Sequence, residues 1–232
     1  MPLPSDDRPG RRPLATESAT HPWESGSTAA GRTREHTPLR RLSRIIGVLL
    51  LSAAVGFGGY MAWLLWGTGI ITARAQADLR ERLSRPLVNE HYNLGDGIAI
   101  IQIPKIDLDM VVVQGTDRES LTKGPGHYVE TAMPWHRRGR VGIAGHRTTY
   151  LHPFWSLDEL ANGDRIRLIT RHGQFDYSVT RVFVIQPWED YVLDQTRKRT
   201  LVLTTCHPRF SAAQRLIVWA DLTAENRSIR AT

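Results

Sequence analysis

The sequence predicts an all-β domain preceded by one transmembrane helix, and two observations support this prediction. Short β-branched and apolar segments, separated by turn residues, fill the region from Gly97 to Leu222. A long run without a charged residue, 45–71, precedes them. About seven or eight short strands joined by turns form either a closed barrel or a sandwich.

The first 44 residues are rich in Pro, Ser, Thr, Gly and Arg and show almost no apolar periodicity. Such a segment offers too little apolar surface to offset the entropy lost on ordering. We therefore interpret residues 1–44 as a disordered arm.

Residues 45–71 are predicted to be a transmembrane signal anchor. A bilayer core of about 30 Å needs about 20 apolar residues in a helix, and this run is longer. A cleaved signal peptide has a shorter apolar run closer to the N-terminus, and a buried core helix of this length does not suit so small a protein. Arg40, Arg41 and Arg44 precede the run, which favours a cytoplasmic N-terminus and an extracellular C-terminal domain. Basic residues also follow the run, so the charge asymmetry is small.

Residues 72–96 are predicted to form a juxtamembrane helix and linker. Leu79 and Leu83 lie at i, i+4 spacing, and Pro86 ends the helical pattern. The globular domain is then expected at 97–222, with a flexible tail at 223–232. About 125 residues are enough for one hydrophobic core.

Within the domain the expected strands share short length and β-branched apolar composition. They lie at 98–103, 110–113, 141–144, 166–169, 175–185, 201–205 and 216–222. The segments 124–126 and 162–164 have turn composition. Helix is expected only over 156–161, with a turn around 119–121.

Composition excludes several function classes. The formal net charge is +7, but many arginines lie in the N-terminal arm, where a membrane explains them better than a nucleic acid does. The sequence contains no metal-ligand spacing, phosphate-binding glycine loop or nucleic-acid motif, so we expect no cofactor, no metal and no nucleic-acid partner. The acidic residues Glu189, Asp190 and Asp194 are interpreted as solvated loop side chains.

The single cysteine, Cys206, ends the apolar segment LVLTTC. A free cysteine is most often a buried structural residue, but a strand end at a barrel rim faces a cleft. Arg215 opens the next strand, so antiparallel pairing would place it beside Cys206. A guanidinium there would favour the thiolate and could hold an oxyanion, but spacing alone favours a solvated strand-edge charge.

The third candidate for a site around Cys206 is a histidine that could act as a base. His146 follows the apolar segment VGIAG, and Gly145 would let the backbone turn sharply and present the imidazole. Spacing cannot rank this histidine above the rival bases, because such residues meet in space and not in sequence. The rivals are His127, His136, His152 and His207.

The combination of AGHRTTY with LTTCHPRFSAAQRLIVWADL resembles the sortase family. The stretch covered runs from about Ile98 to Leu222. The GPGHY stretch and the sequence around the cysteine are most similar to the class E sortases of actinobacteria, with class D as the alternative.

This resemblance implies an eight-stranded β-barrel and assigns three roles. Cys206 corresponds to the nucleophile, His146 to the general acid/base, and Arg215 to the residue that positions the substrate and its oxyanion. Tyr128, Thr205 and His207 are expected to contact the substrate.

The partners implied are exported proteins with a C-terminal LPxTG or LAxTG sorting signal. The acceptor would be a cell-wall precursor amine or a pilin lysine, which leaves a housekeeping and a pilin-polymerising role both open. An L,D-transpeptidase is disfavoured because TTCH lacks that family's Ser-x-Gly context before the cysteine. A membrane-anchored barrel that only binds a partner is the non-enzymatic alternative.

Overall fold

The computed structural model describes residues 38–85 and 91–228. The chain divides into two compact units, Met1–Gly47 and Val48–Thr232, and the second contains all the strands. Most of the predicted disordered arm, residues 1–37, lies outside the described residues. Residues 38–44, which were also assigned to that arm, are helical.

Three consecutive helical segments precede the barrel. They are α1, Pro38–Ala62; a π-helical turn, η1, Trp63–Gly67; and α2, Thr68–Ser84. By length and composition, one helix among the described residues could cross a membrane. It contains the apolar run 45–71, and residues 40–60 expose their side chains along its length. The helix is therefore suited to a single-pass membrane anchor.

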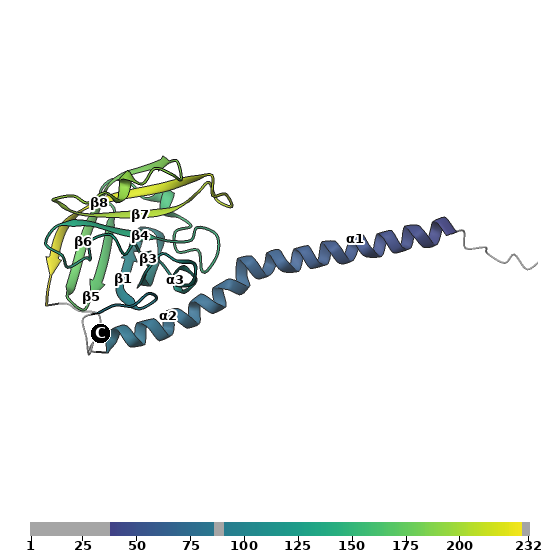
Figure 1. The fold of residues 1–232 in the computed structure, drawn as a ribbon, viewed down its shortest axis with the longest axis horizontal. Coiled ribbons are helices and arrows are strands. Elements are labelled where there is room, and N and C mark those ends of the chain that lie inside the picture. The colour runs from purple at the N-terminus through teal and green to yellow at the C-terminus, as the bar shows by residue number, and fades with distance from the viewer. Residues whose placement is uncertain (1–37, 86–90, 229–232) are drawn as a thin grey trace, which may run out of the picture. The chain divides into compact units, whose positions relative to one another are not determined.

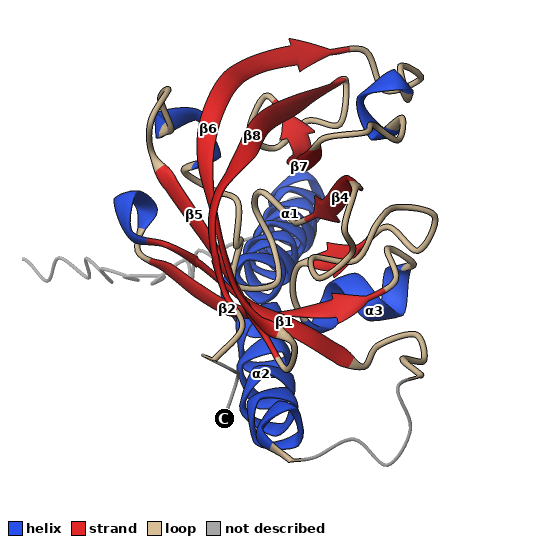
Figure 2. Ribbon diagram, turned by 90° about the vertical axis from the view of Figure 1, so that its left-hand side faces the viewer, coloured by secondary structure: helices blue, strands red, loops and turns tan. Residues whose placement is uncertain are grey.

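The described residues form eight strands that close into one barrel (Figure 2). The strands are β1, Gly97–Ile103; β2, Leu108–Gln114; β3, Gly126–His127; β4, Gly139–Ala144; β5, Arg165–Thr170; β6, Gly173–Ile185; β7, Arg199–His207; and β8, Gln214–Asn226. Their order around the barrel is β1-β2-β3-β4-β7-β8-β6-β5. The pairs β2–β3 and β4–β7 are parallel, and the remaining pairs are antiparallel.

The pairing of β1 with β5 makes the fold a barrel and not a sandwich. Ile100, Ile101 and Gln102 pair with residues of β5 and so leave neither strand as a free edge. The side chains that point into the barrel form one core. Its largest fully buried members include Phe175, Tyr177, Ile101, Ile143, Leu168 and Leu201. Strand periodicity alone could not distinguish the two architectures, because both bury alternate residues.

Short helices are few. The helix α3, Arg118–Lys123, is capped at its N-terminus by Asp117, whose carboxylate accepts hydrogen bonds from the backbone N–H groups of Glu119 and Ser120. The helix expected over 156–161 is reduced to a single 3₁₀ turn, Leu157–Glu159. Two further 3₁₀ turns lie at Pro104–Ile106 and Tyr191–Leu193.

Most strands extend one to four residues beyond their expected limits, and two differences are larger in consequence. The segment 124–126 was assigned to a turn, yet Gly126 and His127 form the short strand β3 between β2 and β4. Strand β8 continues to Asn226, beyond the expected domain end at Leu222, because Asn226 still pairs with Gln174 of β6. Residues 229–232 of the expected tail lie outside the described residues.

Candidate active site

Three neighbouring strands bring the candidate catalytic residues to one rim of the barrel. Strands β4, β7 and β8 lie side by side (Figure 1). In the antiparallel β7–β8 pair, Cys206 is directly opposite Arg215, as expected from the sequence. Directly opposite residues in such a pair project to the same face.

The parallel register of β4 and β7 brings His146 to the same level. Ala144 pairs with Thr204, so His146 and Cys206 each lie two residues beyond that pair. Two hydrogen bonds continue the contact past the end of β4. Gly145 N donates to Thr204 O at 3.1 Å, and the Thr205 hydroxyl donates to Gly145 O at 2.8 Å. The backbone register therefore brings the start of the His146 loop to the level of the cysteine.

His146 and Cys206 line one cavity of about 430 Å³. Its remaining walls come from the loop after β4, the β7–β8 loop and the end of the long apolar helix. These residues are Arg147, Thr148, Thr149, Phe210, Ser211, Ala212, Met61, Leu64 and Leu65. We call this cavity the catalytic groove. Cys206 is half-buried in it, so its sulfur can be reached without unfolding.

His146 lies in a largely apolar environment. Burial lowers the pKa of its imidazole below the ordinary value of 6.5. The ring of Tyr150 packs against it, with ring centroids 4.9 Å apart and planes inclined by 35°. An imidazole that lines the groove can exchange a proton with a group bound there, as a general acid/base requires.

Gly145 serves a different purpose from the sharp turn expected of it. A Cβ at this position would lie 2.5 Å from Cδ2 of Phe154, which is fully buried against it. The glycine is needed because the Phe154 ring packs directly on the backbone. The Phe154 N–H also donates to His146 O at 3.1 Å, which fixes the loop beyond the histidine.

The guanidinium of Arg215 is held by its own loop. Nη1 donates to Ala212 O and to Gln214 O, each at 3.0 Å. Arg215 is not among the described residues that line the catalytic groove, although Ala212 is. Among the described residues, Nε and Nη2 have no protein acceptor, so these donors are available to a substrate oxygen.

Arg147 is a functional candidate to which the sequence analysis assigned no role. Its side chain is 2% exposed and pairs with Asp158 at 2.8 Å. Nη1 donates to Cys206 O at 3.4 Å and meets His207 Nδ1 at 3.1 Å, which must be the acceptor because arginine only donates. Arg147 thus joins the His146 loop to the end of β7. The His-Arg dipeptide was visible in the sequence, but its partners were not.

The residues expected to contact substrate have partners within the protein. The Tyr128 hydroxyl is 2.9 Å from Thr204 Oγ1, and Thr205 is buried with its hydroxyl on Gly145 O. His207 is engaged by Arg147. Among the described residues, none of these three lines the cavity. The rival histidine His127 is fully buried on β3.

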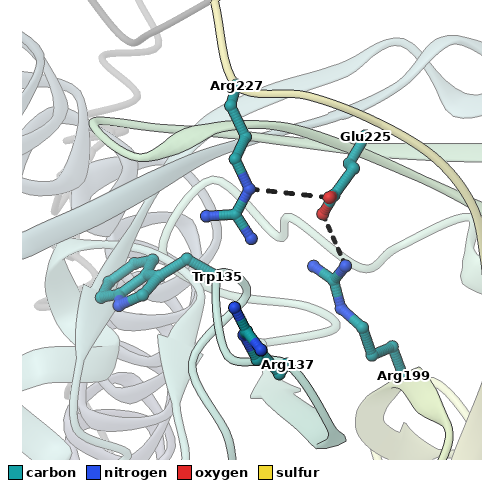
Figure 3. A pocket seen from close by; sticks show the side chains of 5 residues that line it. All are labelled: Trp135, Arg137, Arg199, Glu225 and Arg227. Atoms are coloured by element: carbon teal, nitrogen blue, oxygen red, sulfur yellow. Dashed lines mark hydrogen bonds and ion pairs between the residues drawn. The ribbon is translucent and has the colours of Figure 1, made fainter.

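A second cavity, of about 650 Å³, has different chemistry (Figure 3). Arg199 and Arg227 both pair with Glu225 there, at 2.5 Å and 3.6 Å. Trp135 and Arg137 complete its lining. It contains neither the cysteine nor His146, so the larger cavity is not the candidate active site.

The acidic residues near β7 show no metal-site geometry. In the described part of the chain, no group of three or more His, Cys, Asp or Glu side chains could hold a metal ion. The carboxylate of Glu189 instead accepts from the backbone N–H of Gln186 at 2.6 Å.

Comparison with known proteins gives one consistent family. Residues 101–223 match the model described as "Sortase domain". Sortase SrtE1 of Streptomyces coelicolor is 32% identical over 79% of this chain, and the match spans 58% of that relative's length.

Solved structures agree. A sortase D5 transpeptidase of Clostridium perfringens superposes with a TM-score of 0.59 at 31% identity, covering 66% of this chain and 99% of that one. Sortase E1 of Streptomyces coelicolor, solved with a tripeptide in its active site, superposes with a TM-score of 0.54 at 33% identity. The match covers 59% of this chain and 93% of that one. The chain therefore belongs to the sortase family, a family of cysteine transpeptidases.

Proposed function

We propose that the protein is a membrane-anchored transpeptidase in which Cys206 is the nucleophile, His146 the general acid/base and Arg215 the oxyanion donor. One observation carries this proposal: the ends of β4, β7 and β8 bring these residues to one rim, where His146 and Cys206 share a groove. A reactive thiol needs such access, whereas a structural cysteine does not.

The first half-reaction cleaves the sorting signal. The Cys206 thiolate attacks the carbonyl carbon of the Thr–Gly bond, and the carbonyl oxygen becomes an oxyanion. Nε and Nη2 of Arg215 donate to that oxygen. The C–N bond then breaks as His146 gives its proton to the departing glycine amine, which leaves a thioester on Cys206.

The second half-reaction joins the threonine carbonyl to an acceptor. An incoming primary amine attacks the thioester, and the neutral imidazole of His146 takes the proton that the amine loses. The C–S bond breaks, and the thiolate of Cys206 is restored. Transfer requires that the amine outcompete water, and a groove walled by apolar side chains lowers the local water content.

The substrate we propose is an exported protein with a C-terminal LPxTG-like or LAxTG-like signal, and the acceptor is a cell-wall precursor amine or a pilin lysine. The likeness to a sortase E whose structure contains a tripeptide in its active site supports a peptide substrate for this groove. A membrane anchor confines the enzyme to the surface where such substrates are held, which raises their effective concentration.

The test uses the full chain in phospholipid nanodiscs, with Cys206→Ala as the matched control. Each protein is incubated with LAxTG and LPxTG peptides and an amine acceptor, and the products are followed by intact mass spectrometry. We expect a covalent adduct on Cys206, cleavage between Thr and Gly, and transfer to the amine. The Cys206→Ala variant should give none of these.

A folded wild-type protein that forms no adduct with either peptide would exclude this substrate class. The non-enzymatic binding barrel would then be the better account. Selective, pH-dependent alkylation of Cys206 separates the two, because a relic cysteine has no reason to react faster than an ordinary thiol.

We also propose that the N-terminus is cytoplasmic and the barrel extracellular, on the basis of Arg40, Arg41 and Arg44 before the apolar run. Cys206 is the only cysteine, so one label reports on topology. A membrane-impermeant maleimide should label it in intact cells. If Cys206 were labelled only after lysis, the barrel would lie in the cytoplasm and the proposed orientation would be wrong.

A further inference from the structure

The helix α2 does more than tether the barrel, because one of its faces is buried in it. Thr72 is fully buried and donates from its hydroxyl to Thr122 O at 2.7 Å. Leu79 and Leu83 are 5% and 1% exposed and pack in one cluster with Val111. A mere stalk would be exposed on all sides.

The side-chain amide of Gln76 hydrogen-bonds to the backbone of β2, as a neighbouring strand would. Its Nε2 donates to Val111 O at 2.9 Å and to Lys123 O at 2.8 Å. Its Oε1 accepts from Val111 N at 2.6 Å. Strand β3 reaches only Val113 and Gln114 of β2, so the amide satisfies a stretch of β2 that β3 leaves unpaired. The helix therefore has a defined position on the barrel.

The N-terminal end of α2 holds the loop that follows His146. Thr68 is 4% exposed, and its hydroxyl accepts a hydrogen bond from Tyr150 N at 3.1 Å while donating to Leu64 O at 2.9 Å. A Cβ at Gly69 would lie 3.1 Å from a Leu151 methyl group, so the glycine permits a close approach. The contact places Thr68 against the loop backbone.

This loop needs an external support. Tyr150, Leu151 and His152 have φ values of 54°, 60° and 38°, which residues other than glycine rarely adopt. Such conformations persist only where the surrounding structure holds them. The first of them, Tyr150, carries the ring that packs on His146. A chain of direct contacts thus runs from Thr68 through Tyr150 to the imidazole.

The segment before α2 reaches the groove itself. Met61, Leu64 and Leu65 line it together with His146 and Cys206. They lie in or beside the π-helical turn Trp63–Gly67, and such turns are frequent at functional sites. The neighbouring Trp66 and Ile70 are 72% and 56% exposed and are not among the groove residues.

We propose that four residues at the end of the membrane anchor are part of the catalytic site: Thr68 positions the His146 loop, and Met61, Leu64 and Leu65 form an apolar wall that the bound peptide contacts. This inference rests on the proposed function. It makes Thr68 a positioning residue, and it makes the three apolar residues determinants of peptide affinity.

The first test compares Thr68→Val with Thr68→Ser in the full chain in nanodiscs. Valine keeps the shape but removes the acceptor for Tyr150 N, whereas serine keeps the hydroxyl. We expect Thr68→Val to lower kcat by about 5- to 20-fold with KM nearly unchanged, and Thr68→Ser to stay within about twofold of wild type.

A second readout separates positioning from a general loss of structure. If Tyr150 moves away, His146 becomes more hydrated, and its pKa rises toward the ordinary value. The histidine is titrated by NMR in both variants, with His146→Gln to assign its signal, and thermal unfolding is measured beside it. A Thr68→Val protein with wild-type kcat and an unchanged His146 pKa would overturn the positioning role.

The second test does not depend on a buried side chain. Leu65→Ala shortens the proposed wall, and Ile70→Ala is the matched exposed control on the same helix. We expect Leu65→Ala to raise KM for the peptide by about 3- to 10-fold and Ile70→Ala to leave it unchanged. Equal KM values would remove the wall from the site. A wild type that forms no thioester with either peptide would instead refute the proposed function.

Discussion

The two halves of the candidate active site are held in different ways. Cys206 and Arg215 lie on paired strands, where backbone hydrogen bonds fix their register. His146 lies just beyond β4, and its loop depends on Phe154, Arg147 and Thr68 at the start of α2. A strand pair holds its residues through many equivalent bonds, whereas a loop depends on a few individual contacts.

This difference predicts that activity and stability separate in the strand half and change together in the loop half. A strand-end side chain can be replaced while the ladder remains. A buried loop contact cannot be removed without loosening the segment that carries the histidine.

The largest effect is expected for Arg215→Lys in the strand half. Lysine keeps the charge but cannot supply the forked donors, so kcat/KM for the peptide should fall by about 100- to 1000-fold. The thermal midpoint should not change, because within the described residues the Arg215 side chain donates only to the nearby carbonyls of Ala212 and Gln214. Arg181→Lys, an exposed strand position on β6, is the control. A large fall in melting temperature for Arg215→Lys would contradict the separation.

The next effect concerns two arginines that share one carboxylate in the loop half. Arg147 and Arg209 both pair with Asp158, but their side chains are 2% and 35% exposed. Arg147→Met should lower the free energy of unfolding by about 3 kcal/mol, because it removes a buried donor from Asp158, His207 and Cys206 O. Arg209→Met should lower it by about 1 kcal/mol or less.

Denaturant unfolding of both variants, with turnover measured beside it, tests this pair. Arg147→Met is expected to lose activity along with stability. If Arg147→Met were as stable as Arg209→Met, burial of the pair would not be what holds the loop.

An intermediate effect is expected from pH, through a strand residue that is not catalytic. Burial lowers the pKa of His127 to about 4, and its ring lies within hydrogen-bond distance of Gln114 and Ala132. In the unfolded chain its pKa is about 6.5. Between these values the unfolded state binds the proton and the folded state does not, so stability is full above about pH 6.5 and falls as the pH is lowered toward about 4.

At pH 5 this histidine should cost the folded state about 2 kcal/mol relative to pH 7.5. The matching fall in melting temperature is about 4 to 8 °C. Burial also lowers the pKa of His146, which acts in the same direction. The control is therefore His146→Gln, whose loss of stability between about pH 7.5 and about pH 5 is compared with that of His127→Gln. His127→Gln should reduce the acid sensitivity more than His146→Gln does. Equal slopes for wild type and His127→Gln would refute the assignment.

The same division explains what could be predicted from the sequence. The all-β class, seven of the eight strands and the Cys206–Arg215 pairing follow from local composition and from antiparallel pairing. Strand β3 was missed because two residues carry no periodicity, and β8 was predicted too short because its last residues are polar and exposed.

Contacts between distant segments could not be predicted. His146 was singled out from nine histidines by family resemblance, since its position beside Cys206 depends on a parallel pairing that spacing does not reveal. In helix α2, the i, i+4 spacing of Leu79 and Leu83 is part of a longer stripe of buried residues. Thr68, Thr72 and Gln76 continue the stripe of Leu79 and Leu83 along one helix face, and polar residues in such a stripe indicate a buried hydrogen-bonded surface.

The smallest effect tests how that helix is held. Gln76 makes three hydrogen bonds to the barrel backbone, whereas Arg80, four residues later, makes an exposed ion pair with Asp109. Gln76→Ala should weaken the docking of α2 by about 1 to 2 kcal/mol, and Arg80→Ala by less than about 0.5 kcal/mol.

Hydrogen exchange of the full chain in nanodiscs measures both variants directly. In Gln76→Ala, amides of α2 should exchange about 10-fold faster, and the loop after His146 should lose protection with them. Strands β7 and β8 should keep theirs, because their ladder does not involve the helix. If Gln76→Ala loosened α2 while the His146 loop kept full protection, the helix would be docked on the barrel without supporting the histidine, and the contrast between the two halves would rest on Arg147 and Phe154 alone.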